Sequence, residues 1–476
     1  MPHSSCDPTL ALVIDLDGTL LRTDLLYENL LAVAKSSPLK LLRLPFWLLR
    51  GKANVKARLA AAADVPVEHL PFDERVLQAM REHPAGTKVL CTASDERLAQ
   101  RVAAAVGGFD EVFASDGRIN LSGHRKADAL VARFGEKGFI YVGNARPDVE
   151  VWRHAAAAWV VNAGKDLAES AARVTRLEQH WPAAPQGLGA WSKALRLHQW
   201  LKNLLVFAPL LAAHQVFDPA NALLALAAFF AFGLGASAVY VVNDLFDIEA
   251  DRQHPTKRHR PFASGRLPLL AGIIMAPLLG IASLAMAAWV GSAFLAWLLT
   301  YLMLTTAYTL VLKQLAIADI IALATLYTLR IFAGAAAVSV DVSFWLLAFS
   351  VFIFLSLALV KRYTELHDLR ERGKSVAVGR GYGVADLPLL ASFGSASGYV
   401  AALVLALYVD AAGATGLYTS PEFLWGLCPI LLGWISRVWL LAHRGQMHDD
   451  PVVFAAHDRT SWALCAVSLA VVVAAL

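Results

Sequence analysis

Cysteine is scarce in this chain of 476 residues, and its placement excludes two kinds of architecture. The four cysteines, Cys6, Cys91, Cys428 and Cys465, lie far apart, and no two of them form a CxxC pair. Without paired spacing, the sequence predicts neither a disulfide framework nor a zinc site. The histidines are scattered as well, without the spacing of metal ligands.

A secretion signal and a nucleic-acid-binding pattern are also missing. The N-terminal stretch MPHSSCDPTLALVIDLDGTL has no basic region followed by an apolar one, so we expect no signal peptide and a first domain that stays in the cytoplasm. No interleaving of basic and aromatic residues indicates a nucleic-acid partner. The formal net charge of +4 is small, so the placement of charges is more informative than their sum.

Long apolar runs are absent before about residue 191 and recur from there to the C-terminus. The chain is 57% hydrophobic with a mean hydropathy of +0.51, which is too apolar for a protein that is soluble throughout. It is also too long for one domain. We therefore expect a soluble domain over residues 8–170, a proline- and glycine-rich linker over 171–192 and a membrane domain over 193–476.

The soluble part alternates short apolar runs with helical stretches. The run 10–14 is typical of a buried strand, and it ends in Asp15 and Asp17, followed by Gly-Thr. Because this motif follows a strand, both carboxylates should lie in the crevice of an α/β sheet. The alternation predicts a parallel, doubly wound sheet. Further strands are expected at 88–91, 111–113, 139–142 and 158–161, separated by helical stretches such as 96–106.

With these motifs in order, the soluble domain resembles the haloacid dehalogenase-like (HAD) phosphatase superfamily, which implies a Rossmann-like fold with a helical cap. By this resemblance Asp15 is the nucleophile that forms an aspartyl-phosphate, and Asp17 is the general acid and base. Thr92 matches the hydroxyl that orients the phosphoryl group, and Lys126 matches the lysine that neutralises its charge. The resemblance implies a phosphatase.

The same resemblance implies a Mg²⁺ site in this domain. Its ligands would be Asp15, Asp17 and two residues of the stretch GNARPD, Asn144 and Asp148. The superfamily has an acid where this chain has Asn144, and an amide is a weaker metal ligand. Two interpretations therefore stay open, an active phosphatase and an inactive, regulatory descendant.

An insertion over residues 22–80 stands where such phosphatases carry a helical cap. It contains the apolar and basic stretch LLRLPFWLLR, residues 41–50. We expect this stretch to form part of the core of the cap. The alternative is that it lies on a membrane surface.

The second half of the chain contains nine apolar runs, most of them near the ~20 residues that a spanning helix requires. The loops after the second, fourth, sixth and eighth runs contain Lys or Arg, whereas the loops after the first, third, fifth and seventh contain neither. The positive-inside rule then predicts nine spans in an all-α integral membrane domain, with a cytoplasmic N-terminus and an external C-terminus. The runs are 201–217, 219–242, 268–290, 292–312, 317–338, 343–360, 387–409, 423–443 and 461–476.

An acidic motif, NDLFDIEAD, stands at the end of the second run. Asp244, Asp247 and Asp251 are spaced i, i+3 and i+7, so on a helix they share one face, with Asn243 at its edge. Carboxylates so close repel each other unless a cation lies between them, and oxygen ligands suit Mg²⁺, which shares its shell with phosphates. The alternative is an interfacial loop that only solvates the helix end. Counter-charges for a polyphosphate follow at Lys257, Arg258 and Arg260.

Nine apolar runs with NDxxDxxxD after the second resemble the UbiA superfamily of intramembrane prenyltransferases. The stretches 196–209, 308–313, 330–334 and 361–365 are similar to the branch of this superfamily that makes decaprenyl-phosphate phosphoribose. The aromatic prenyltransferases usually carry a second acidic motif, DxxxD, but here Asp319 stands alone, with Leu323 where its partner would be. Arg330 lies within an apolar run, where a charge is costly enough to indicate function. The resemblance implies substrate-binding roles for Lys202, Asn203, Tyr308, Lys313, Arg330, Lys361 and Arg362.

The resemblance implies Mg²⁺-dependent transfer of 5-phosphoribose from phosphoribosyl diphosphate to a polyprenyl phosphate in the bacterial inner membrane. The fused phosphatase would then remove the 5-phosphate from the lipid product. Two alternatives stay open. One is an aromatic polyprenyltransferase that uses a polyprenyl diphosphate and carries a regulatory head, and the other is a binding or transport module. The sequence predicts no oligomeric state.

Overall fold

The computed structural model describes residues 10–183, 187–375, 380–412, 418–447 and 450–476. They form two compact units. The first unit combines Met1–Leu195 with Tyr240–Ala276, and the second combines Arg196–Val239 with Pro277–Leu476. The segment that connects two long apolar helices therefore belongs to the same unit as the soluble domain.

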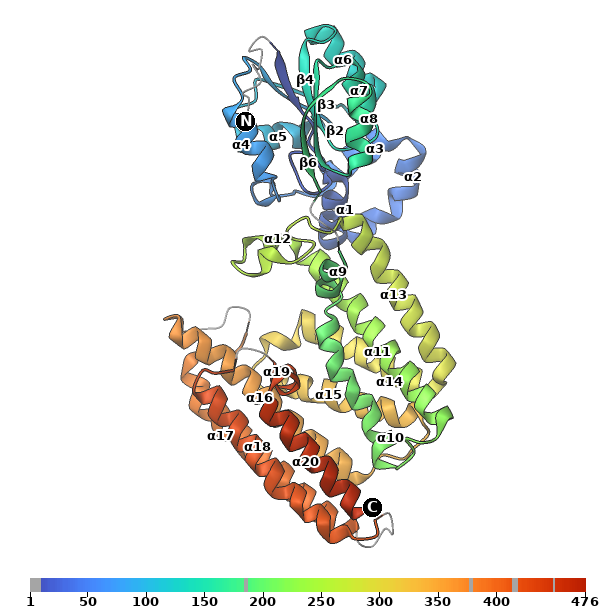
Figure 1. The fold of residues 1–476 in the computed structure, drawn as a ribbon, viewed down its shortest axis with the longest axis vertical. Helices are drawn as coiled ribbons and strands as arrows, with labels where there is room; N and C mark the ends of the chain where they lie inside the picture. The colour runs from blue at the N-terminus through green and yellow to red at the C-terminus, as the bar shows by residue number, and fades with distance from the viewer. Residues whose placement is uncertain (1–9, 184–186, 376–379, 413–417, 448–449) are drawn as a thin grey trace. The chain divides into compact units, whose positions relative to one another are not determined.

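The first unit is built on a sheet of six parallel strands in the order β3-β2-β1-β4-β5-β6 (Figure 1). The central strand β1 pairs with β2 on one side and with β4 on the other. The predicted parallel α/β fold is confirmed. The strands are β1 (Ala11–Ile14), β2 (Lys88–Asp95), β3 (Glu111–Ser115), β4 (Phe139–Gly143), β5 (Ala157–Ala163) and β6 (Arg176–Pro182).

The sixth strand lies in a segment that the sequence predicts as a linker. β6 pairs with β5 in parallel register, and α9 (Leu188–Ala194) follows it. Prolines and glycines dominate the end of this segment, so the sequence pattern does not indicate the short strand that precedes them. The domain therefore extends beyond residue 170.

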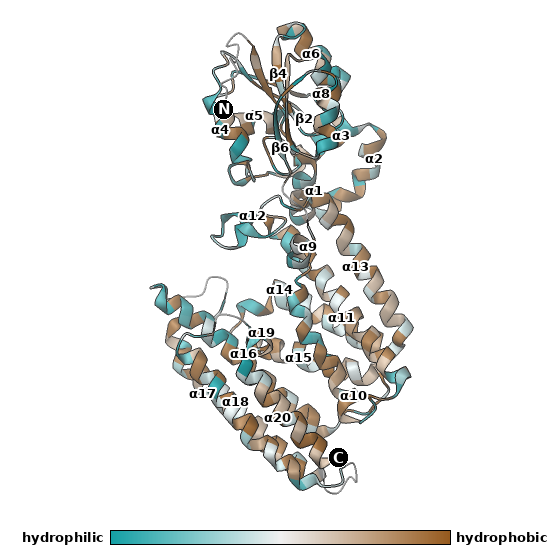
Figure 2. Cartoon of the chain, viewed as in Figure 1, coloured by the Kyte–Doolittle hydropathy of each residue, from teal (hydrophilic) through white to brown (hydrophobic). Residues whose placement is uncertain are grey.

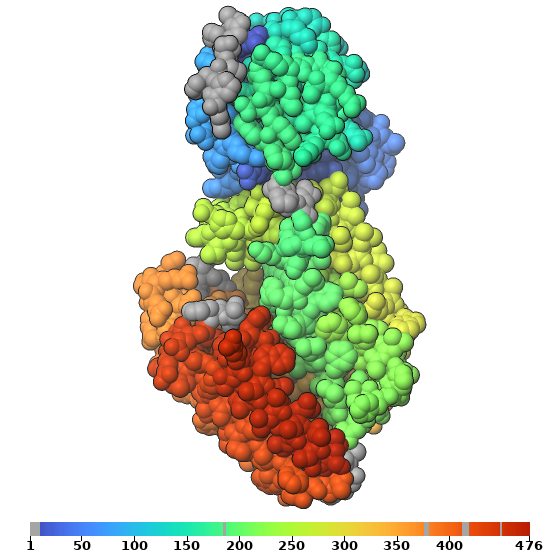
Figure 3. Space-filling model, in the orientation of Figure 1, coloured from blue at the N-terminus to red at the C-terminus, as the bar shows by residue number. Residues whose placement is uncertain are grey.

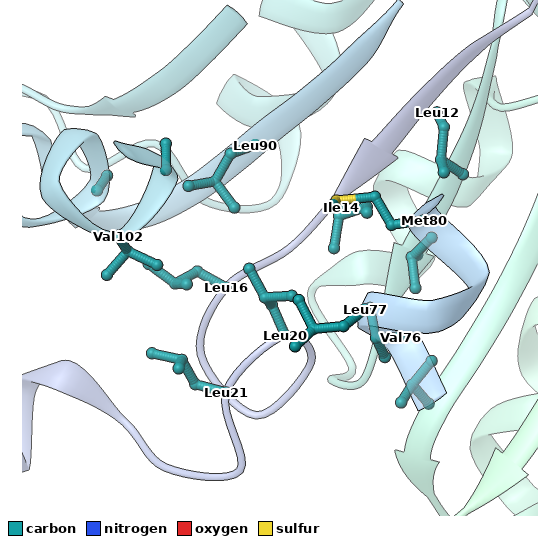
Figure 4. Packing of buried hydrophobic residues seen from close by; sticks show 14 of the residues in the cluster. Leu12, Ile14, Leu16, Leu20, Leu21, Val76, Leu77, Met80, Leu90 and Val102 are labelled. Carbon is teal, nitrogen blue, oxygen red and sulfur yellow. The ribbon is translucent and has the colours of Figure 1, made fainter. Parts of the chain in front are cut away.

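Alternate side chains of β1 point to opposite faces of the sheet, and each face has its own core. Leu12 and Ile14 belong to one cluster, whereas Ala11 and Val13 belong to the other. Figure 4 shows the first cluster, in which residues of β1 and β2 meet Met80 of α4 (Glu74–Glu82) and Val102 of α5 (Glu96–Val106). Because helices cover both faces, the strand is apolar at every position. The second face is covered by α6 (His124–Phe134), α7 (Asp148–His154) and α8 (Lys165–Ala172).

The insertion after β1 forms a set of short helices, and it corrects one prediction. The stretch 41–50 does not form cap core, because η1 and α2 contain no buried residue. Leu41, Leu44 and Trp47 pack partly against a small cluster with Val33 and Val55, but the apolar residues between them face outward. A helix of one or two turns cannot bury an apolar side chain at nearly every position. The helices are α1 (Leu25–Ser36), η1 (Pro38–Arg43), α2 (Leu44–Leu49) and α3 (Lys52–Ala62).

The segment over residues 240–276 packs against helix α1 through an apolar cluster that includes Leu31, Leu245 and Phe262. The Arg252 guanidinium donates two hydrogen bonds, of 2.6 and 3.1 Å, to the buried Glu28 carboxylate of α1. These contacts hold the segment firmly to the cap. It contains the end of α11 (Pro219–Phe246), α12 (Ile248–Gln253), η4 (Lys257–His259) and the start of α13 (Leu269–Val290).

The described chain has seven helices long and apolar enough to cross a membrane, or eight if one bent pair is a single span. Figure 2 colours most of the length of these helices as hydrophobic. The bent pair is α19 (Pro451–His457) and α20 (Arg459–Ala475), which meet at 83°. The others are α11, α13, α14 (Ser292–Leu310), α15 (Ala318–Ala337), α16 (Phe344–Glu371), α17 (Leu387–Ala412) and α18 (Leu427–His443) with the turn that precedes it.

The nine predicted spans are not confirmed, and the first run differs most. Residues 201–217 form no single long helix, because η3 (Leu197–Phe207) is followed by the short helix α10 (Ala208–Ala212). Pro209 lies in the first turn of α10, where its missing N–H is tolerated, whereas in the interior of one long helix it would remove a backbone hydrogen bond. Apolar composition alone did not reveal this break.

Candidate functional site

A buried ion pair lies at the carboxyl ends of the central strands. Lys126 Nζ donates to Asp15 Oδ1 at 2.6 Å and to the Tyr141 hydroxyl at 2.9 Å. The Tyr141 hydroxyl donates in turn to Asp148 Oδ1 at 2.9 Å. Burial alone would lower the pKa of Lys126, but the Asp15 carboxylate reverses the shift, so the amine stays charged. The structure brings the three predicted residues together, and Tyr141 is a member of the site that the sequence did not reveal.

Asp17 lies beside this pair and is held by two donors. The Leu25 backbone N–H donates to Oδ1 at 2.9 Å, and the Ser94 hydroxyl donates to Oδ2 at 2.5 Å. Burial raises the pKa of Asp17 to about 7, and the neighbouring Asp24 carboxylate contributes. A carboxyl group with a pKa near neutrality can both give and take a proton at physiological pH.

The predicted hydroxyl of Thr92 is fully buried and accepts the Ser94 backbone N–H at 3.0 Å. The hydroxyl that reaches Asp17 belongs to Ser94, two residues further along β2. No spacing in the sequence distinguishes these two positions.

Two oxygens in this region converge on one hydroxyl. The Thr19 hydroxyl lies 3.3 Å from Asp15 Oδ2 and 3.2 Å from Asn144 Oδ1. Asp148 Oδ2 accepts the backbone N–H groups of Asn144 and Ala145, at 3.0 and 2.9 Å. The carboxylates of Asp15, Asp17 and Asp148 all accept from protein donors, and Asp15 Oδ2 and Asn144 Oδ1 are oxygens of a type that could also bind a divalent cation. Within the described ranges, no three Asp, Glu, His or Cys side chains gather as metal ligands.

These residues line a cleft of about 820 Å³, which is the size of a small-molecule site. Asp15, Asp17 and Lys126 lie in its wall, together with Lys56 of α3. A further part of the wall comes from the segment after η4, including Arg266. The cleft is therefore completed by the segment that also carries the acidic motif.

The acidic motif forms a pair rather than a stripe of three. Asp244 and Asp251 are buried and converge on Arg260, whose Nη1 donates to them at 3.1 and 2.7 Å. Asp247 is exposed at the break between α11 and α12. Burial raises the pKa of Asp251, and Arg260 offsets part of that shift. Two carboxylates that converge on one cationic group also fit a divalent cation.

The other predicted residues of this motif lie apart from the pair. Lys257 and Arg258 are exposed on η4, and Asn243 is half-buried on α11. A short 3₁₀ helix turns these cations outward, while Arg260, just after it, turns inward. The spacing of these residues in the sequence does not indicate which basic side chains point inward and which point outward.

In the second unit, two predicted lysines meet on one carboxylate. Lys202 Nζ and Lys361 Nζ donate to Asp450 Oδ2 at 2.7 and 3.0 Å. The Tyr327 hydroxyl donates to Asp450 Oδ1 at 3.1 Å. Asp450 lies 248 residues from Lys202 along the chain, so no spacing in the sequence indicates that the two side chains meet. We call these residues the lysine cluster.

Arg330 is buried within α15, beside the lysine cluster in the same unit. Its guanidinium donates to Asn203 Oδ1 at 2.9 Å and to the Tyr301 hydroxyl at 3.0 Å, and also to the Leu326 carbonyl. Among the described residues, these hydrogen-bond partners are all neutral. A buried guanidinium held only by neutral groups keeps its positive charge available to an anion.

A second cation cluster surrounds Asp319. Arg362 donates to Asp319 Oδ1 at 3.0 Å and to the Tyr308 hydroxyl at 2.8 Å. Arg380 reaches the same two groups, at 3.4 and 3.1 Å. Asp319 is fully buried, and two guanidinium groups neutralise its charge. Lys313, on η5 (Leu312–Gln314), joins neither cluster within the described part of the chain.

Three known proteins are similar in sequence to this chain. The uncharacterized protein y4nM of Sinorhizobium fredii is 37% identical over 465 residues, which cover 96% of this chain and 89% of that protein. Nodulation protein NoeC of Azorhizobium caulinodans is 38% identical over 284 residues, which cover 59% of this chain and 91% of that protein. Decaprenyl-phosphate phosphoribosyltransferase of Mycobacterium tuberculosis is 41% identical over 189 residues, which cover 39% of this chain and 62% of that enzyme.

The sequence model of the UbiA prenyltransferase family matches residues 204–474, more than half of the chain. This match covers most of the long apolar helices and the acidic motif. The protein is therefore an integral membrane protein that belongs to the UbiA prenyltransferase family.

Proposed function

We propose that the membrane domain transfers 5-phosphoribose from phosphoribosyl diphosphate to a polyprenyl phosphate. The observation that carries this proposal is the neutralised state of Asp319 between Arg362 and Arg380. An aromatic prenyltransferase would use a second set of free carboxylates for its metal, whereas the Asp319 and Glu365 carboxylates of this chain are both paired with Arg362 and Arg380. The similarity to an enzyme named decaprenyl-phosphate phosphoribosyltransferase supports the same donor and acceptor.

In this reaction, a phosphate oxygen of the acceptor lipid attacks C1 of the ribose, and the diphosphate leaves with the electrons of the C1–O bond. Both substrates are anionic, so the site must bind several phosphate groups. Arg330, Lys202 and Lys361 would bind phosphate oxygens, with Asp450 as the counter-ion of the lysines in the free protein. Arg362 and Tyr308 would orient the donor.

Mg²⁺ is the proposed cofactor of both halves. Asp244 and Asp251 would hold it in the membrane domain, and Asp15 and Asn144 would hold it in the soluble domain. When bound, the cation supplies positive charge that stabilises a departing diphosphate or a transferring phosphoryl group.

We further propose that the soluble domain is a HAD-type phosphatase that removes the 5-phosphate of the lipid product. An oxygen of Asp15 attacks the phosphorus, and Asp17 donates a proton to the departing ribose oxygen. Asp17 then takes a proton from the water that hydrolyses the aspartyl-phosphate. The raised pKa of Asp17 and the charged Lys126 beside Asp15 support these roles.

A topology proposal accompanies these activities. Nine crossings, with the broken segment over 197–212 as the first, would place the soluble domain in the cytoplasm and the C-terminus outside a bacterial inner membrane. Both active sites would then face the same compartment, and a short tether would keep the phosphatase at high effective concentration near the lipid product.

The test uses purified full-length protein with Mg²⁺, polyprenyl phosphate and ribose-labelled phosphoribosyl diphosphate. The proposal predicts label in the lipid fraction that depends on both substrates. Turnover of a polyprenyl diphosphate with an aromatic acid, and no labelled lipid, would support the aromatic alternative instead. Binding of either substrate without turnover would support the binding or transport alternative.

A further inference from the structure

The cap presents an apolar surface that the proposed activities do not use. In η1 and α2, Leu39, Leu42 and Leu49 are 78%, 74% and 86% exposed, and Phe46 and Leu48 are exposed as well. Figure 3 shows the surface of this blue part of the chain, and Figure 2 shows its apolar character. We call residues 38–50 the apolar cap segment. A soluble domain rarely exposes so many large apolar side chains in one short stretch without a partner.

The charge around this segment has one sign. Between residues 29 and 63 the chain has no Asp and no Glu. Basic side chains frame the exposed apolar residues, and those nearest to them are themselves exposed. The cations of this stretch are Lys35, Lys40, Arg43, Arg50, Lys52, Lys56 and Arg58. Apolar side chains next to cations, without acids, are typical of segments that lie in the headgroup region of an anionic bilayer.

The cap also packs against the ends of two long apolar helices within its own unit. Helix α1, which leads directly into the apolar cap segment, packs through Leu31 in one cluster with Leu245 near the end of α11 and Leu269 at the start of α13. Both of these helices are long and apolar enough to span a membrane. The ends of two candidate membrane spans therefore lie against α1 of the cap.

We propose that the apolar cap segment inserts into the headgroup region of a bilayer that contains anionic phospholipid. Leu42, Phe46 and Leu49 enter the boundary of the acyl chains, while Arg43 and Arg50 extend to lipid phosphates. A membrane is the occupant because the segment is basic as well as apolar and is joined to the ends of two spanning helices. This inference does not depend on the chemistry of either site.

The test is a spin-label measurement on the full-length protein in nanodiscs. Cys6, Cys428 and Cys465 are changed to Ser, and the buried Cys91 is retained. A nitroxide is attached at Leu49→Cys in one variant. In the control variant it is attached at Arg173→Cys, an exposed position on the same domain.

We expect the Leu49 label to be several-fold more accessible to oxygen than to a water-soluble nickel chelate, and the Arg173 label to show the opposite. The preference at position 49 should weaken in nanodiscs without phosphatidylglycerol and in the Arg43→Glu, Arg50→Glu background. Equal access of the nickel chelate to both positions would overturn the proposal. So would dipolar broadening between labels of two copies without a preference for oxygen, which would assign the segment to self-association.

Discussion

The candidate sites of the two units differ in their balance of buried charge. In the first, each buried carboxylate of the candidate sites has a donor or a cation: Asp15 pairs with Lys126, and Asp244 and Asp251 share Arg260. In the second, the buried guanidinium of Arg330 is held by neutral partners among the described residues. The first arrangement has no excess of positive charge, because the Asp15–Lys126 pair is neutral and Asp244 and Asp251 share a single guanidinium. The second has an excess of positive charge, which is what a site for multiply phosphorylated substrates requires.

The largest expected effect separates the two activities. Asp15→Asn removes the proposed nucleophile, so release of free phosphate from the lipid product should fall at least about a thousandfold. Transfer of labelled phosphoribose to the lipid should continue. Asp95→Asn is the matched control, because Asn caps the first turn of α5 as well as Asp does. Phosphate release that is equal in Asp15→Asn and the parent protein would contradict the phosphatase proposal.

The next effect tests the excess positive charge in the second unit. Arg330→Met should lower the transfer rate by about 10- to 100-fold, the value of a lost charged hydrogen bond. Its melting temperature should fall less than that of a variant in which a buried carboxylate loses its cation, because the partners that Arg330 leaves are neutral. In the control Arg437→Met, Asp458 loses a paired cation, so stability should fall while transfer changes little. The opposite pattern, a loss of stability in the Arg330 variant with transfer intact, would show that Arg330 is structural.

A third change tests whether Asp450 is a counter-ion that a substrate phosphate replaces. Asp450→Asn leaves Lys202 and Lys361 close together without their carboxylate, so the free protein should lose about 1–3 kcal/mol of stability. Phosphoribosyl diphosphate should then raise the melting temperature more in the variant than in the parent protein. An equal shift in both would mean that substrate does not reach the lysine cluster.

The smallest effect concerns a neutralised carboxylate of the first unit that takes no part in the proposed chemistry. Burial alone would raise the pKa of Asp73, but donors on Arg75, Arg22 and Asn162 hold it well below its usual range. A depressed folded-state pKa contributes stability above the unfolded value, near ~4, and this stability is lost as the pH falls further. Asp73→Asn should therefore reduce the fall in melting temperature below about pH 4. The comparison of the two acid-melting curves checks this.

The sequence predicted most of what lies on regular strands. One apolar run and one motif predicted β1 and the two acids that follow it. Side chains that follow a strand of a parallel sheet lie in the crevice at the carboxyl ends of the strands. Lys126 and Asp148 were assigned to the same site by the resemblance to HAD phosphatases, and the structure brings them to Asp15. Tyr141 was missed because its role depends on side-chain direction within a predicted strand. Ser94 was missed because β2 extends to Asp95, beyond the predicted strand over 88–91.

The membrane half was harder to predict. Its cation clusters join residues that lie far apart in the chain, such as Lys202 and Asp450, so only the packed fold shows which charges meet. The stretch 41–50 was assigned to the core because it is apolar, yet short helices with apolar residues on every side must expose some of them. Hydropathy likewise predicted a first span where Pro209 breaks the helix.

The most direct measurement uses phosphoribosyl diphosphate that carries ³²P in the 5-phosphate and ³H in the ribose. With the parent protein, the lipid product should contain ³H and progressively lose ³²P, while Asp15→Asn should keep both labels in equal proportion. That result would support transfer by the membrane domain followed by hydrolysis in the soluble domain. A lipid fraction without ³H, or a ³²P to ³H ratio that is the same in both proteins, would contradict the two-step account.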